Sequence, residues 1–183
     1  ILSSVWMDGL YDNPGRAFLD SVFQVTSILT GTGFGTADFD RWPDLSRLLL
    51  VGLMFVGGCA GSTTGGMKIM RVAIGFKAAF REVRLMFSPN SVLAVFVGRQ
   101  PVPNGVVASV MGFLLLYIGI WALGSVFLSI GAPDLETAAS ASIAVLGNIG
   151  PGLSEVGTTN NFAFFSGWQK LVMVLLMLLG RLE

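Results

Sequence analysis

A glycine-punctuated segment occurs twice in this chain at a fixed separation. Residues 29–36 read LTGTGFGT and residues 146–152 read LGNIGPG. A shift of 117 residues places Gly33 on Gly150 without a gap (33 + 117 = 150). In both copies an apolar segment of helical length precedes the glycines, and a second apolar segment follows after a loop. The repeat therefore predicts, twice over, a helix, an extended strand and an exit helix.

An extended glycine strand between two helices is suited to binding a cation. A cation gives up its water only where a row of backbone carbonyls replaces that water, and glycine lets the backbone aim them inward at positive φ. For either copy taken alone, an ordinary glycine cap at a helix end is the alternative, but the equal spacing favours a repeated ion-binding strand. The backbone groups expected to bind the ion belong to Gly31, Thr32, Gly33, Phe34, Asn148, Ile149 and Gly150.

The composition is that of a membrane protein. Hydrophobic residues make up 53% of the chain and charged residues 12%, and the mean hydropathy is +0.74. Residues 106–130 carry no charge and are long enough to cross a bilayer, which takes about 20 residues. Residues 162–179 carry only Lys170. We therefore expect an all-α membrane protein, because a soluble protein with a large core rarely contains so long an uncharged run.

The same composition excludes several functional classes. The net charge is zero, so the chain lacks the basic surface that nucleic-acid binding requires. There is no histidine and the one cysteine is Cys59, which excludes Ser/His/Asp and Cys/His catalysis. The glycine-rich residues 57–68 lack the GK[ST] ending of a nucleotide-binding P-loop. We expect no enzymatic activity and no cofactor in this chain.

The first copy comprises residues 1–87. Asn13 and Pro14 form a helix start, in which a cap residue is followed by proline at the first helical position. The helix that they begin is too short and too polar to span a bilayer, so we expect a pore helix whose negative C-terminal end points at the glycine strand. The expected segments are the pore helix 14–30, the filter strand 31–35 and a broken exit helix 44–87.

Residues 104–183 form the second copy, and residues 88–103 are expected to form a cytoplasmic hairpin or linker with its first strand at 92–97. Pro133 is expected to open the second pore helix, with Asp134 and Glu136 favourably placed in the first turn. The expected segments are an entry helix 104–131, the pore helix 133–147, the filter strand 148–152 and a truncated exit helix 162–183.

Charge asymmetry orients the chain in the membrane. By the positive-inside rule, residues 68–103 are cytoplasmic and the mouths of the filter strands face the extracellular or periplasmic side. We interpret the basic run as a solvated cytoplasmic face, with docking of anionic lipid or of a cytoplasmic partner as the alternative. Against the single acid Glu82, this segment contains Lys68, Arg71, Lys77, Arg81, Arg84 and Arg99.

Residues 57–66 interrupt the apolar pattern with glycine and hydroxyl side chains. Each glycine weakens a helix by about 1 kcal/mol relative to alanine, and the hydroxyls compete for backbone hydrogen bonds. A broken helix at membrane depth is tolerated only where it lines a cavity, which predicts a gate below the strands. Close helix packing through a small-xxx-small stripe is the alternative. The expected gate residues are Gly57, Gly58, Gly61, Ser62, Thr63, Thr64, Gly65 and Gly66.

Arg181 places a charge deep in an apolar segment. It follows Gly150 by 31 residues, as Thr64 follows Gly33. If the two copies share their geometry, Arg181 lies at the depth of the broken segment, where carbonyls freed by the break would pair with its guanidinium group. An interfacial arginine that reaches up to the lipid headgroups is the alternative.

Four stretches of this chain resemble the Trk/Ktr family of bacterial potassium transporters: TGTGFGTADFDRWP, GGCAGSTTGGMKIMR, LGNIGPGLSEVG and MLLGRLE. They occur in the family's order and span almost the whole chain. The resemblance implies four M1–P–M2 repeats around one pore, of which this chain holds the third without its first helix and the fourth cut inside its last. It also implies that Gly33 and Gly150 are filter glycines, that residues 57–66 are the family's intramembrane loop, and that Arg181 faces this loop.

By the same resemblance, the transported ion is K⁺, held by filter carbonyls alone. The resemblance further implies a homodimer in the lipid of the bacterial inner membrane, with a cytoplasmic nucleotide-binding regulatory subunit. Gly31 departs from the family pattern, in which a threonine-like residue is expected at that position. Two alternatives stay open: a Na⁺ or mixed K⁺/Na⁺ transporter of the same architecture, and a non-conducting membrane scaffold whose glycines serve helix packing.

Overall fold

The structure is a computed structural model that describes residues 1–183 apart from 3–4, 6–9, 12, 63, 89–92 and 183. The described residues are mostly helical. Three short 3₁₀ turns cover Phe39–Arg41, Ser154–Val156 and Phe162–Phe164. The helices and strands are α2 (Pro14–Leu29), α3 (Asp44–Val56), α4 (Ile69–Phe87), β1 (Val95–Val97), β2 (Gln100–Val102), α5 (Asn104–Ser129), α6 (Leu135–Leu146) and α7 (Gly167–Arg181).

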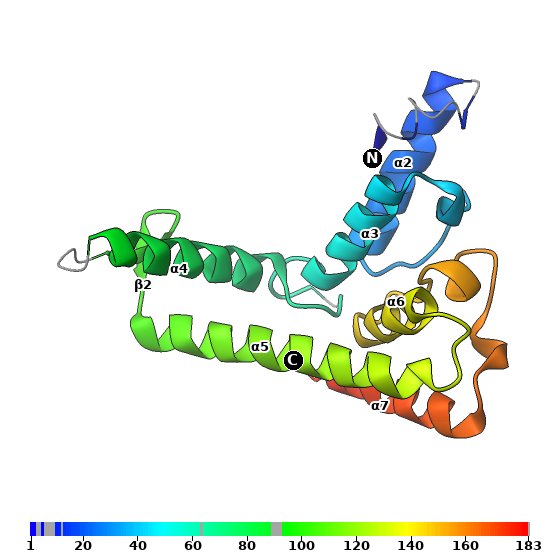
Figure 1. Ribbon diagram of the computed structural model, residues 1–183. Helices are drawn as coiled ribbons and strands as arrows, with labels where there is room; N and C mark the ends of the chain where they lie inside the picture. Colours follow the sequence, from blue (N-terminus) through cyan, green and yellow to red (C-terminus); the bar gives the residue numbers. More distant parts are fainter. Residues whose placement is uncertain (3–4, 6–9, 12, 63, 89–92, 183) are drawn as a thin grey trace.

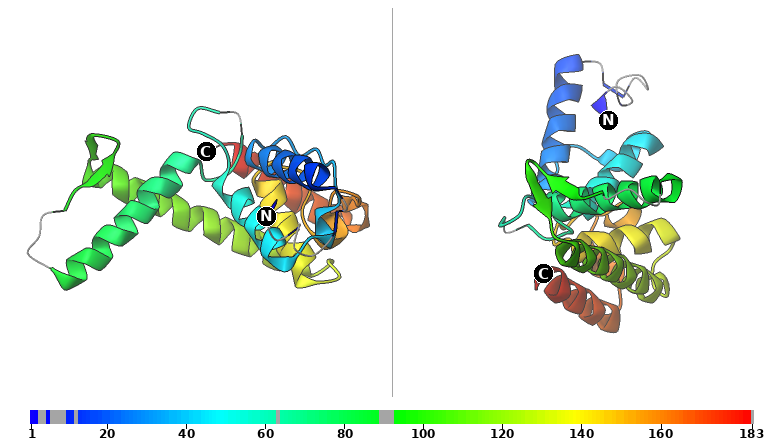
Figure 2. Two further views of the ribbon diagram at one scale, coloured as in Figure 1. Left: turned by 90° about the horizontal axis from the view of Figure 1, so that it is seen from above. Right: turned by 90° about the vertical axis from the view of Figure 1, so that its left-hand side faces the viewer.

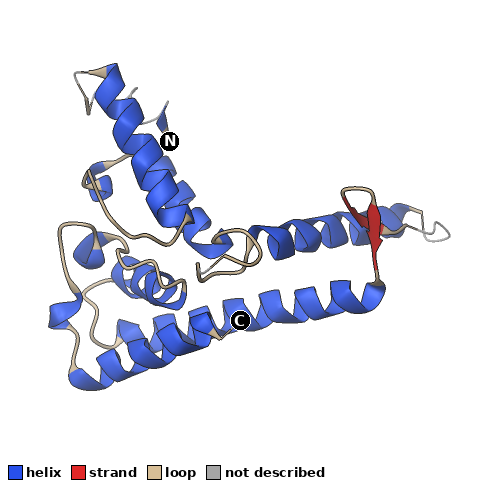
Figure 3. Cartoon of the chain, turned by 180° about the vertical axis from the view of Figure 1, so that it is seen from behind, coloured by secondary structure: helices blue, strands red, loops and turns tan. Residues whose placement is uncertain are grey.

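The short helix α6 is the centre of the arrangement. It contacts α5, α7 and α3, and Figure 1 shows it in yellow between them. α2 packs against α3, and α4 packs against α5. Figure 2 shows that α4 and the first part of α5 extend away from the other helices. The two pore-helix candidates, α2 and α6, therefore lie at one end of the molecule, and the β hairpin lies at the other (Figure 3).

Both short helices have polar caps, and one of the two expected helix starts is wrong. α2 begins at Pro14 as predicted, and the side chain of Asn13 accepts a hydrogen bond from Gly15 N–H at 2.9 Å. α6 begins at Leu135 rather than Pro133, because Asp134 is its cap residue and accepts the N–H of Thr137 at 2.6 Å. This hydrogen bond holds the pKa of Asp134 below its ordinary value. The cap, rather than the proline, sets the start.

The last helix also begins later than the apolar pattern predicts. Residues 162–164 form a separate 3₁₀ turn, and α7 begins only at Gly167. Its start is fixed by a capping box, in which the side chain of Gln169 accepts the backbone N–H of Ser166 at 3.0 Å. Hydrophobicity alone could not locate this boundary, because the turn and the helix are equally apolar. α5 ends at Ser129, short of the expected residue 131.

The linker between the two copies contains the expected hairpin. Val97 pairs with Gln100 across a tight turn, in which Gly98 has a φ of +61°. The first strand begins at Val95, and residue 92, where we expected it to start, lies outside the described residues. Lys77 on α4 donates to the carbonyl oxygen of Phe96 at 2.7 Å, so the hairpin is fastened to α4.

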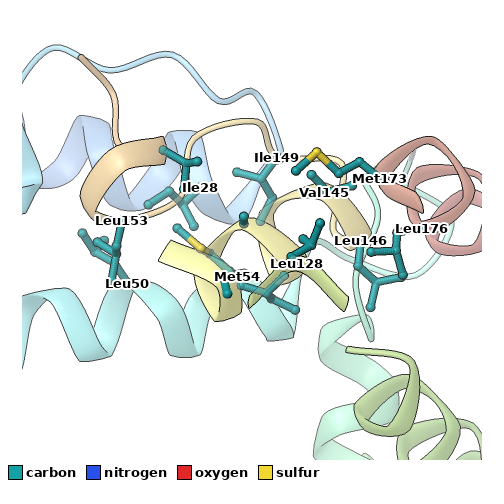
Figure 4. Packing of buried hydrophobic residues seen from close by; sticks show 14 of the residues in the cluster. Ile28, Leu50, Met54, Leu128, Val145, Leu146, Ile149, Leu153, Met173 and Leu176 are labelled. Carbon is teal, nitrogen blue, oxygen red and sulfur yellow. The ribbon is translucent and has the colours of Figure 1, made fainter. Parts of the chain in front are cut away.

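One contiguous core joins the two copies. Ile28 from α2, Leu50 and Met54 from α3, and Leu128 from α5 are fully buried around α6 (Figure 4). Ile149, in the second glycine strand, belongs to the same core. By length and composition, α5 is the helix among the described residues that could cross a membrane, with a mean hydropathy of 2.3 over its best window. Only 17% of that window is buried within this chain.

α5 approaches both α6 and α7 closely at Gly124. A Cβ atom at this position would lie 2.5 Å from Oγ of Ser142 on α6 and 2.9 Å from Cδ1 of Leu176 on α7. By contrast, a Cβ atom at Gly119 on the same helix would have no atom of this chain within 4 Å. The absence of a side chain at Gly124 thus lets three helices meet.

We predict that Gly124→Ala destabilises the protein by about 1–3 kcal/mol, the usual effect of overfilling a packed core. Thermal unfolding in detergent measures the change, and Gly119→Ala is the matched control because its methyl group points into open space. Equal unfolding temperatures for the two variants would show that the contact at Gly124 can relax without loss.

Candidate functional site

The two glycine strands leave their helices through the same hydrogen bonds. Three bonds in the first copy have counterparts 117 residues later, with the same donor and acceptor groups and similar lengths, whereas the bond from Gly33 N–H to Ser27 O (3.4 Å) is described in the first copy alone. The equal spacing in the sequence therefore corresponds to a similar backbone geometry at the start of both strands. In the first copy, Thr30 N–H donates to Thr26 O (2.9 Å), Gly31 N–H to Ile28 O (3.1 Å) and Thr32 N–H to Ser27 O (2.9 Å). In the second, Gly147 N–H donates to Ile143 O (2.8 Å), Asn148 N–H to Val145 O (3.0 Å) and Ile149 N–H to Ala144 O (2.9 Å).

The backbone torsions repeat as well. Gly31 and Gly33 have φ values of +66° and +75°, and their counterparts Asn148 and Gly150 have +52° and +113°. Glycine adopts such values without steric cost, and asparagine is among the few other residues that tolerate them. Alternate residues with positive φ turn successive carbonyls in a way that a regular strand does not. The positive φ values predicted for Gly33 and Gly150 are present.

The two strands lie directly against each other. A Cβ atom on Gly33 would overlap the carbonyl oxygen of Ile149. Ile149 anchors its strand with a buried side chain, whereas Phe34 is 71% exposed within this chain. The carbonyl of Phe34 accepts a hydrogen bond from Oγ of Ser27 at 2.7 Å, which fixes the outer part of the first strand to α2.

The loops that follow the two strands are linked to each other. The carboxylate of Asp40 accepts the backbone N–H of Ser154 at 2.9 Å. The carbonyl of Ala37 accepts hydrogen bonds from Gln24 at 3.1 Å and from Thr158 at 3.3 Å. Desolvation by burial raises the pKa of Asp40 above its ordinary value. These contacts hold the outer ends of both strands together.

The exit helix of the first copy is interrupted at the predicted place. α3 ends at Val56 and α4 begins at Ile69. The chain between them forms a loop whose two ends are joined by backbone hydrogen bonds. Met67 N–H donates to Phe55 O and Ile69 N–H donates to Gly58 O, both at 3.1 Å. A continuous glycine-packed helix is therefore wrong for this segment. We call residues 57–66 the break loop; Thr63 within it lies outside the described residues.

The break loop lies at the inner ends of both strands. Oγ1 of Thr64 donates to the carbonyl of Thr30 at 2.9 Å. A Cβ atom on Gly65 would overlap the carbonyl oxygen of Gly147. Thr30 and Gly147 are equivalent positions (30 + 117 = 147), and each directly precedes its glycine strand. Two neighbouring residues of the loop thus contact the same point of both copies.

Lys68 is a site residue that the sequence interpretation missed. Its side chain is buried and donates to the carbonyl of Ser62 at 2.9 Å and to that of Thr64. The guanidinium of Arg71 lies 4.3 Å from the ring centre of Phe113. The prediction of a solvated basic face is therefore wrong for Lys68, the first residue of that face. The signal was available, since a cation that directly follows a broken helix is close to the carbonyls that the break leaves unpaired.

Arg181 is the last residue of α7 and is exposed in this chain. A Cβ atom on the preceding Gly180 would overlap the carbonyl oxygen of Leu146, and Asn148 donates to Met177 O at 3.1 Å. The end of α7 therefore lies beside the inner end of the second strand. Contact of Arg181 with the break loop stays a prediction. The described hydrogen bonds from a cation to carbonyls of the loop come from Lys68.

Comparison with known protein families matches residues 11–183 to the TrkH family, described as "Cation transport protein". The chain is 38% identical over 180 residues to the Trk system potassium uptake protein TrkH of Halomonas elongata, and 34% identical to that of Escherichia coli. It is 35% identical over 179 residues to the Trk system potassium uptake protein TrkG of Escherichia coli. Each TrkH alignment covers 98% of this chain but 37% of the relative, so the chain spans a little over a third of their length.

The fold has a counterpart among solved structures. The crystal structure of the potassium transporter TrkH from Vibrio parahaemolyticus superimposes with a TM-score of 0.90 and 36% sequence identity. The match covers 99% of this chain and 38% of the solved chain. The likeness extends through the helices, both strands and the loops between them.

Replacing Asp40 by alanine should lower stability by about 1–3 kcal/mol, because the N–H of Ser154 loses its acceptor. Burial raises the pKa of Asp40, so the stability linked to its protonation is complete at acid pH and is lost as the pH rises through the raised pKa. The deficit of the alanine variant should therefore be at least as large near pH 4 as at neutral pH. Thermal unfolding at both pH values measures it.

Asp44→Ala is the matched control for Asp40→Ala, because the Asp44 side chain is fully exposed and its ion pair with Arg47 is a surface pair. A deficit of the Asp40 variant that is present only at neutral pH would contradict the raised pKa.

Proposed function

The chain belongs to the TrkH family of cation transport proteins, and we propose that it contributes two of the filter strands that line a potassium-selective pore. It is an all-α membrane protein and not an enzyme. In this proposal K⁺ loses its water at the mouth of the pore and is held by carbonyls of residues 31–34 and 148–150. No cofactor takes part, since backbone oxygens and helix ends supply the charge.

The repeated hydrogen bonds at the start of each strand are the observation that carries this proposal. They place the residues with positive φ at the same points of both copies, directly after α2 and α6. The C-terminal end of a helix has a partial negative charge, which falls off within the last turn. A cation bound at the strands lies within the range of this charge. Packing alone would require small residues, but not matched torsions in two copies.

We propose that the break loop is the gate of this pore. It contacts Thr30 and Gly147, the residues that precede each strand, so it lies on the path of an ion that leaves the filter inward. Arg181, at the end of α7, adds a positive charge at the same depth. Such a charge lowers the occupancy of cations beneath the filter by repulsion, and more strongly than in bulk water because the surroundings are less polar.

We propose that the two repeats of this chain form half of a pore built from four such repeats. We also propose a homodimer in the lipid of the bacterial inner membrane, with residues 68–103 on the cytoplasmic side and the filter mouths outside. Arg81, Arg84 and Arg99 then face a cytoplasmic nucleotide-binding regulatory subunit. This orientation is supported by the distribution of basic residues along α4 and the hairpin.

The filter proposal predicts that Gly33→Ala reduces the preference for K⁺ over Na⁺, because a methyl group at this position overlaps the carbonyl of Ile149 and turns it. The loss should be on the order of tenfold or more in the ratio of uptake rates, since carbonyl number and direction set the selectivity. Ion uptake by the complete transporter that contains this chain measures the ratio.

The control for Gly33→Ala is Gly112→Ala on α5, where the added methyl group has no neighbour within 4 Å. An unchanged ratio in the Gly33 variant would contradict the filter. Equal uptake of K⁺ and Na⁺ before any substitution would favour the mixed transporter, and absence of uptake in the intact protein would favour the scaffold.

Deleting residues 61–64 should raise K⁺ flux through the complete transporter, because the obstruction and its contact with Thr30 are both removed. Single-channel or uptake measurements detect the increase, and K⁺ preference should persist because the strands keep their own hydrogen bonds to α2 and α6. A deletion variant that is folded but transports more slowly would contradict gating by this loop.

A further inference from the structure

Three features of the position of Lys68 are unfavourable for a lysine side chain. It precedes the first turn of α4, where the partial positive charge of the helix end repels a cation. Its φ is +65°, a conformation that residues with a side chain rarely adopt. Its side chain is only 3% exposed, although an ammonium group is strongly hydrated in water. Acceptors close to the ammonium group must offset these costs.

The described acceptors are carbonyls of the break loop. Nζ of Lys68 donates to Ser62 O at 2.9 Å and to Thr64 O. Thr64 in turn donates through Oγ1 to the carbonyl of Thr30. One hydrogen-bonded series therefore runs from the start of α4, through the break loop, to the residue before the first filter strand. Hydrogen bonds from a charged donor are the stronger members of such a series.

We propose that Lys68 is a positioning residue that holds the break loop beneath the first filter strand by way of Thr64, and we call the series Lys68–Thr64–Thr30 the latch. This inference rests on the proposed gating role of the loop. Because Lys68 is the residue before α4, a displacement of α4 moves the latch and the loop together.

Beyond its first two turns, α4 is attached to parts of the chain that could displace it. Lys77 donates to Phe96 O of the hairpin at 2.7 Å, and Arg81 donates to Oδ1 of Asn104 at the start of α5 at 3.0 Å. A force applied to the hairpin is thus transmitted along a single helix to Lys68. The latch gives a cytoplasmic event a physical route to the inner end of the filter.

Lys68→Met tests the latch, because it keeps an unbranched side chain and removes the charge and all donors. The probe is the thiol of Cys59, which lies in the break loop and is exposed in this chain. We expect the rate of its modification by a thiol-reactive maleimide, in the complete transporter with any other cysteines replaced, to rise on the order of tenfold. K⁺ uptake should rise with it, while the K⁺/Na⁺ ratio stays unchanged.

The matched control is Lys170→Met on α7, which removes an exposed lysine that also donates to a backbone carbonyl, that of Ala163 at 3.0 Å. It should leave the Cys59 rate near that of the parent. A faster Cys59 reaction in the Lys170 variant, equal to that of Lys68→Met, would overturn the proposal, because loss of any lysine bound to a carbonyl would then loosen the loop.

Thr64→Val provides a second test that preserves shape and cannot remove a buried charge. It deletes the hydroxyl that bonds Thr30 and should speed Cys59 modification as Lys68→Met does. Because both residues belong to one series, the double variant should react little faster than either single variant. Fully additive effects would overturn the latch, as would an unchanged Cys59 rate in both single variants.

The latch and the gate can fail separately. If Lys68→Met speeds Cys59 modification while deletion of residues 61–64 leaves flux unchanged, the latch stands and the gating role falls. If the deletion raises flux while Lys68→Met leaves Cys59 and flux unchanged, the gate stands and the latch is overturned.

Discussion

The site depends on backbone packing directly against backbone. At three points where other parts of the chain meet residues 146–149, a side chain of any size would overlap a carbonyl oxygen: Gly33 at Ile149, Gly65 at Gly147, and Gly180 at Leu146. Two of these contacts join the copies, and the third seats α7 against the end of α6. Such an arrangement brings peptide groups, rather than side chains, to the place where an ion would be bound. It also explains why glycines recur in segments that are otherwise strongly apolar.

Features that depend on glycine could be predicted from the sequence, whereas some helix boundaries could not. The strands, their positive φ values and the break in the exit helix follow from local chemistry, because glycine spacing and the low helix propensity of residues 57–66 are written in the chain. The helix starts at Asp134 and Ser166 were harder, since a capping hydrogen bond outweighs both a neighbouring proline and an apolar run. When a cap residue lies within two or three residues of a proline or an apolar run, the sequence pattern does not show which of them sets the helix start.

Lys68 shows a different limit. Charge counting assigned it to a cytoplasmic face, because it opens a run of six basic residues. The structure turns it back toward the loop, since the carbonyls of Ser62 and Thr64 have no helix to bond. The same reasoning predicts a partner for Arg181, more than a hundred residues away, but it applies first to the nearest cation. Local satisfaction of backbone groups is the stronger constraint, because an unpaired carbonyl at membrane depth has no water to replace the lost bond.

The two copies match up to their strands and then diverge, and this divergence bears on gating. A shift of 117 places Gly57, Gly58 and Gly61 on Val174, Leu175 and Leu178 of α7. These are apolar residues within a helix that continues to Arg181, so only one of the two exits is broken. A single loop that reaches Thr30 and Gly147 therefore contacts the inner ends of both strands. In the gate that we propose, this loop is the moving part, and the unbroken α7, which packs through Gly180 against Leu146, is the fixed part.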